Sequence, residues 1–93
     1  MKPDTLIKVI QYDLKDKEYI VHEIDELSKQ EKDSLHKLLN SLIEQCHKAL
    51  SKAERSLNSY KKQQDKQELF RRVISSIEDN IANYDYYLRR TNM

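Results

Sequence analysis

The residues of this sequence that could hold a metal ion are three histidines, one cysteine and many carboxylates. Glu44 and His47 have the Glu-x-x-His spacing of di-iron sites in helical bundles. In those sites both side chains project into the core, whereas Glu44 lies between Leu42 and Cys46 in sequence and so on the opposite side of a helix from them. His36 and His47 share a helix face, but about 16 Å of helix separates them. The sequence therefore predicts no metal site and no cofactor.

Nucleophilic catalysis is the next chemistry to consider. Cys46 belongs to an apolar repeat, where burial would hide a thiol and make it less reactive. Serines are plentiful, but the chain contains no glycine, and its one proline is Pro3. Nucleophile elbows and phosphate-cradling loops mostly need glycine, because it adopts positive φ without steric cost. We therefore expect a protein that is not an enzyme.

Arginine and tyrosine side chains recur on one face of the C-terminal segment, away from its apolar residues. The repeat proceeds in steps of four and three and comprises Arg72, Ser76, Asp79, Asn83, Tyr86 and Arg90. Guanidinium and phenol groups anchor protein interfaces, so one interpretation is a protein-binding ridge on which Tyr86 faces solvent. An alternative is binding of nucleic acid or a phosphorylated ligand through Arg71, Arg72, Arg89 and Arg90. A third is a plain solvated face, on which Glu78 and Asp79 partly neutralise the arginines.

Three helices are predicted to position these residues, over 4–27, 29–62 and 66–90. Ser28 and Glu31 form a capping box that starts the second helix, and Asp65 with Glu68 is a similar start signal for the third. The first helix is predicted from an apolar stripe that comprises Ile7, Ile10, Leu14, Val21 and Ile24. A competing interpretation breaks it near Asp16, where charged residues crowd together and residues 19–21 have strand-like character.

The apolar repeats of the second and third helices predict an all-α fold, an antiparallel three-helix bundle with coiled-coil-like packing. At 1.5 Å per residue the central helix is about 50 Å long and its partners about 36 Å, so its end would overhang them. Leu57 and Tyr60 lie on that overhang, and we expect self-association or a partner protein to cover it. The two repeats are Leu35, Leu39, Leu42, Cys46, Ala49, Ala53, Leu57 and Tyr60, then Phe70, Val73, Ile74, Ile77, Ile81, Tyr84 and Leu88.

The composition excludes some classes of function but does not identify one. The 93 residues suit one domain, and 17 Lys and Arg against 16 Asp and Glu leave no bulk charge to attract nucleic acid. No segment approaches the roughly 20 apolar residues of a membrane span, and the single cysteine favours a cytoplasmic location. The prediction is a non-enzymatic, helical protein-binding module, a small regulator, inhibitor or adaptor and a homo-oligomer, which binds through Leu57, Tyr60, Arg72, Tyr86 and Arg90.

Overall fold

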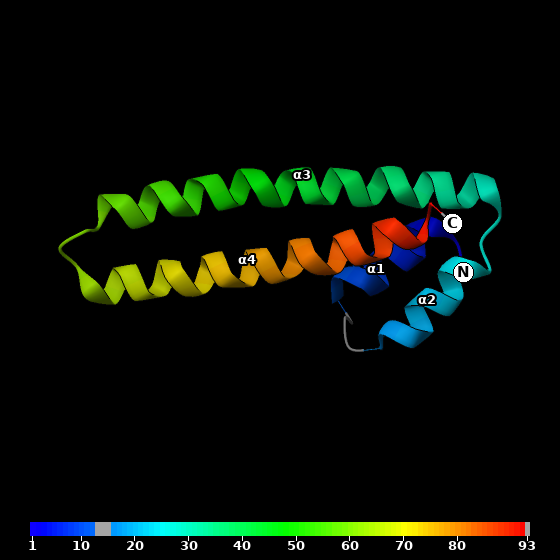
Figure 1. Ribbon diagram of the computed structural model, residues 1–93, viewed down its shortest axis with the longest axis horizontal. Coiled ribbons are helices and arrows are strands. Elements are labelled where there is room, and N and C mark those ends of the chain that lie inside the picture. Colours follow the sequence, from blue (N-terminus) through cyan, green and yellow to red (C-terminus); the bar gives the residue numbers. More distant parts are fainter. Residues whose placement is uncertain (13–15, 93) are drawn as a thin grey trace.

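The chain folds into a long helical hairpin with two short helices packed at one end (Figure 1). The structure is a computed structural model that describes residues 1–12 and 16–92. Within those residues it contains four helices and no strand: α1 (Pro3–Tyr12), α2 (Lys17–Asp25), α3 (Lys29–Ser59) and α4 (Gln64–Arg90). α3 and α4 run antiparallel side by side, while α1 packs on α3 and α2 on α4. The predicted all-helical fold is confirmed.

The first predicted helix, 4–27, is wrong as a single element, because the chain forms α1 and α2 there. The break falls near Asp16, as the competing interpretation had it, and Asp16 Oδ1 accepts a hydrogen bond from the Tyr19 amide at 3.0 Å. That interpretation's strand-like character at residues 19–21 is wrong, since they are helical. Leu14, part of the predicted stripe, lies outside the described residues. Two shorter helices bury a different set of side chains: Leu6, Ile10, Ile20 and Ile24 are buried, whereas Ile7 and Val21 are half-buried.

The start of α3 is the predicted capping box. Ser28 Oγ accepts from the Glu31 amide at 3.2 Å, and the Ser28 amide donates to Glu31 Oε1 at 3.0 Å. α3 then continues unbroken to Ser59, three residues short of the predicted end. α4 begins at Gln64, two residues earlier than predicted, so Asp65 lies inside the first turn and is not the N-cap. Its end at Arg90 agrees with the prediction.

The core lies at the end of the molecule where all four helices meet. One polar link there joins the start of α3 to the residue after α4, because His36 Nδ1 lies 2.8 Å from Thr91 Oγ1. Large side chains from each helix fill the space between them. The buried cluster comprises Leu6, Ile10, Ile20, Ile24, Leu27, Leu35, Leu39, Tyr84 and Tyr87.

The other part of the hairpin has only two helices in cross-section (Figure 1). We call residues 49–80 the distal hairpin, and Ala53 is its one buried residue. The predicted overhang consisted of the end of the central helix alone. In the structure α4 packs along the length of α3, and both helices extend beyond α1 and α2. Leu57 and Tyr60 are accordingly half-buried, and the Tyr60 ring stacks on Phe70 of α4 at 5.6 Å.

Candidate protein-binding surface

The face of α4 that enters the core continues into the distal hairpin without a covering layer. Val73 lies two heptads before Tyr87 and so on the same face of the helix. Tyr87 is fully buried in the cluster that α1 and α2 complete, whereas Val73 is 39% exposed. Leu69, about five helical turns before Tyr87, shares this face and is 58% exposed. One apolar face is thus covered at one end of α4 and open at the other.

The matching face of α3 changes from large to small side chains along its length. Leu35 and Leu42 pack in or against the core, but the next two residues of that heptad position are Ala49 and Ser56. Ala49 is exposed and Ser56 half-buried. Small side chains permit another helix to approach closely, since interaxial distance depends on the residues at the contact. The open face of the distal hairpin therefore combines large residues on α4 with small ones on α3.

The five residues predicted to bind a partner fall into two separate groups. Leu57, Tyr60 and Arg72 belong to the distal hairpin, where Arg72 Nη2 pairs with Glu68 Oε1 at 3.1 Å and remains largely exposed. Tyr86 and Arg90 lie about 21 Å or more further along α4, beside α2. The structure does not bring the two groups onto one site.

Tyr86 is half-buried, which corrects the prediction that it faces solvent. Its ring contacts Tyr87 edge-on at 5.4 Å, and Lys17 of α2 lies 5.3 Å from the ring centroid. The Arg90 guanidinium is also 5.3 Å from that centroid, and its Nη2 donates to the Tyr86 hydroxyl at 3.3 Å. A cation this close to an aromatic ring is attracted to it by a cation–π interaction. Tyr86 and Arg90 thus help to hold α2 on α4, a role that the sequence pattern did not reveal.

The four arginines of the phosphate-binding alternative do not form one site either. Arg71 and Arg72 precede Arg89 and Arg90 by about 26 Å of helix. Within the part of the chain that the structure describes, Arg72 pairs with Glu68 and Arg89 Nη2 pairs with Asp85 Oδ2 at 3.1 Å. A single phosphate group therefore cannot contact both pairs.

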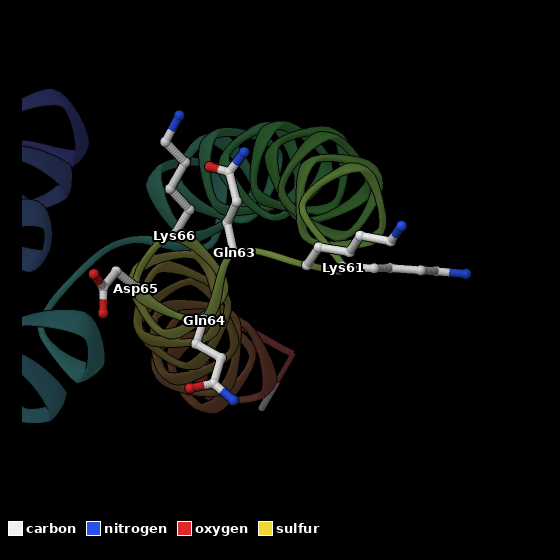
Figure 2. Close-up of a pocket in the computed structure, with 6 residues that line it drawn as sticks. Lys61, Gln63, Gln64, Asp65 and Lys66 are labelled. Carbon is white, nitrogen blue, oxygen red and sulfur yellow. The ribbon is translucent and has the colours of Figure 1, made fainter.

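The turn between α3 and α4 carries an open hollow that is lined by residues 61–66 (Figure 2). Lys61 and Lys66 point in different directions there, and Lys66 Nζ lies 4.7 Å from the centroid of the Tyr60 ring. A substrate site has polar groups that converge on a concave, mostly apolar pocket. The side chains at this turn diverge instead, so the hollow lacks convergent polar groups of that kind.

The residues first considered for metal binding and catalysis lie apart. In residues 1–12 and 16–92, no three His, Cys, Asp or Glu side chains are grouped so as to hold a metal ion. Cys46 is half-buried, and burial raises the pKa of its thiol, which lowers the thiolate fraction at neutral pH. None of the helices in these residues is long and apolar enough to cross a membrane.

Comparison of the chain with models of known families, with curated proteins and with solved structures found no match. Its function is therefore inferred from the surface of the molecule. Sequence reasoning missed Leu69 and assigned Val73 to the core. The heptad relation of Val73 to Tyr87 was visible, but only the lengths of α1 and α2 determine which of the two residues is covered.

Proposed function

We propose that this chain is a non-enzymatic, helical protein-binding module whose binding surface is the open face of the distal hairpin. The observation that supports it is the exposure of Leu69 and Val73 on the same face of α4 that is buried around Tyr87. Burying one such aliphatic side chain completely is worth about 1.5–3 kcal/mol. Because Leu69 is 58% and Val73 39% exposed, covering both gains about half of that value for each, and neighbouring contacts would supply the rest of the free energy that a small regulator, inhibitor or adaptor requires.

A helix or helical hairpin of the partner is the element that fits this surface. Laid along α3 and α4, it would contact the large side chains of Leu69 and Val73 and approach α3 closely at Ala49. Tyr60 and Arg72 flank that face and would form the rim. Residues 52–72 contain seven Lys and Arg against three Asp and Glu, which favours a partner with an acidic surface.

The test is affinity capture from the source cells with a matched pair of variants. Val73→Glu places a carboxylate on the open face, whereas Ser75→Glu places the same charge on the exposed opposite side of α4. We expect the partner to be recovered with the wild type and with Ser75→Glu and to be lost with Val73→Glu, while circular dichroism shows equal helicity. Equal recovery with all three proteins would rule out this surface.

The second candidate is binding of nucleic acid or a phosphorylated ligand, and the observation in its favour is the basic tip. Lys61, Lys62 and Lys66 are exposed at the turn, with Arg71 and Arg72 on the adjoining part of α4. Binding to phosphates releases counterions, so affinity for single-stranded RNA or DNA must fall steeply between low and physiological salt. Absence of binding at low salt would exclude this function.

A further inference from the structure

We propose that the partner of the distal hairpin is a second copy of this chain, packed antiparallel to the first so that the two hairpins form a four-helix bundle. This inference rests on the proposed function, because it assigns an occupant to the same open face. The two chains would be related by a two-fold axis that crosses the distal hairpin at its middle, with α4 against α4 and α3 against α3.

The cross-section of the molecule supports this arrangement. Four helices surround the core at one end, but only α3 and α4 are present in the distal hairpin (Figure 1). α3 is about 46 Å long, whereas α1 and α2 are each about 15 Å or shorter, so roughly 30 Å of the hairpin has no cover. Two identical open stretches placed antiparallel cover each other completely, and the four-helix cross-section then continues along both chains.

The side chains on the open face suit a symmetric contact. Val73 lies near the middle of the uncovered part of α4, so it would meet Val73 of the second copy across the axis. Ser56 lies at a similar height on α3, as the pairing of Tyr60 with Phe70 shows. A small residue at that height lets the two α3 helices approach closely. Ala49 continues the same small face toward the core.

Charge complementarity selects the antiparallel orientation. The tip segment, residues 52–72, has seven basic and three acidic residues. In the antiparallel pair each tip reaches the start of α2 on the other copy, where Asp16 and Glu18 are exposed. In a parallel pair the two basic tips would lie together and repel each other. The chain's net charge of +1 does not oppose association.

The first measurement is the molar mass in solution by light scattering on a sizing column. We expect the wild type and Ser75→Glu to have twice the 11.2 kDa of one chain, and Val73→Glu to have half that mass with unchanged helicity. A monomeric wild type would overturn the proposal, as would a dimer that Val73→Glu leaves intact.

Disulfide cross-linking then tests the position of the axis. Val73→Cys in a Cys46→Ser background, treated with copper phenanthroline as the oxidant, should form a covalent dimer, because a disulfide needs Cβ atoms about 3.5–4.5 Å apart. Ser75→Cys in the same background should stay monomeric on a denaturing gel. A dimer in solution that cross-links at neither position would overturn the antiparallel geometry.

The capture experiment above separates the two proposals. If the wild type is monomeric and Val73→Glu still abolishes capture of a different protein, self-association is wrong and the proposed function stands. If the wild type is monomeric and capture is the same for every variant, both proposals are wrong.

Discussion

We expect that removing the hydroxyl oxygen of Tyr87 will stabilise this protein. Tyr87 is fully buried, and within the described residues its hydroxyl has no hydrogen-bond partner. Burying a hydroxyl without a partner costs about 1–3 kcal/mol in proteins. Tyr87→Phe removes that cost and keeps the ring with its edge-on contact to Tyr86, while the missing oxygen leaves a small void that offsets part of the gain. We expect a net gain of about 1 kcal/mol in the free energy of unfolding, or roughly 4–8 °C in Tm.

The neighbouring residue supplies a matched control, since Tyr86→Phe is the same chemical change in a different environment. The Tyr86 hydroxyl accepts a hydrogen bond from Arg90 Nη2 at 3.3 Å and is part-buried. Its removal loses that bond, so we expect stability to fall by about 0.5 kcal/mol. Urea denaturation followed by circular dichroism measures both variants, and equal m values would show that the same surface unfolds in each.

Alkaline pH gives an independent readout of the same hydroxyl. Burial raises the pKa of Tyr87, and the negative charges that Tyr86 and Asp16 carry at high pH add to the shift. The unfolded chain therefore loses this proton first, so the stability of the wild type does not depend on this group below about pH 10 and falls as pH rises from there through the folded pKa. Tyr87→Phe lacks this loss, and its advantage over the wild type should grow above pH 10. A Tyr87→Phe variant that is less stable than the wild type at neutral pH would refute the reasoning, because it would mean that the hydroxyl has a stabilising partner.

Three further predictions follow from the caps and the thiol. Ser28→Ala removes the acceptor for the Glu31 amide and should lower stability by about 1 kcal/mol, measured by thermal melting, whereas Ser34→Ala, within α3, should change it little. The Ser28 hydrogen bonds, first the backbone one and then the hydroxyl, lower the pKa of Glu31, so its contribution is present above the ordinary value of 4.5 and is lost as pH falls through the folded pKa. Ser28→Ala keeps the backbone amide and loses only the hydroxyl, so the wild type should lose slightly more stability in acid than this variant. Asp16→Ala removes the N-cap of α2 and should also cost about 1 kcal/mol, with Lys17→Ala, which lacks a capping role, as the comparison. Burial raises the pKa of Cys46, so iodoacetamide should alkylate it more slowly in the folded protein than in urea, and equal rates would show that α3 and α4 do not protect the thiol.

The parts of the fold that local sequence determines were predicted well. The Ser28 capping box involves atoms only three residues apart, so the start of α3 can be read without knowledge of any other helix. The break before α2 was harder to predict, because Val21 follows Leu14 after seven residues, so the apolar residues keep one helical phase across the break. Asp16 indicated a break, whereas the periodic apolar stripe favoured one continuous helix. In the structure the chain breaks there and Asp16 caps α2.

The candidate surface was predicted poorly, because exposure depends on how far α1 and α2 extend. Tyr86 and Arg90 have the spacing of a solvent-facing ridge, yet Lys17 of α2 lies over the Tyr86 ring. Val73 has the spacing of a core residue, yet it is 39% exposed. The apolar periodicity of a sequence predicts on which side of a helix a residue lies. Whether another helix covers that side depends on the tertiary structure, which the periodicity does not predict.

The absence of glycine connects these observations. The chain contains no glycine, and the turn after α3 and the first turn of α4 place three exposed lysines at the tip of the hairpin. These lysines keep the tip in water, while Leu69 and Val73, a few residues further on, favour burial. A hairpin whose tip is charged and whose adjoining face is apolar gains most from a neighbour that covers the face and neutralises the tip. In the dimer that we propose, the open face of the antiparallel second copy would cover this face, and Asp16 and Glu18 of that copy would lie near the tip.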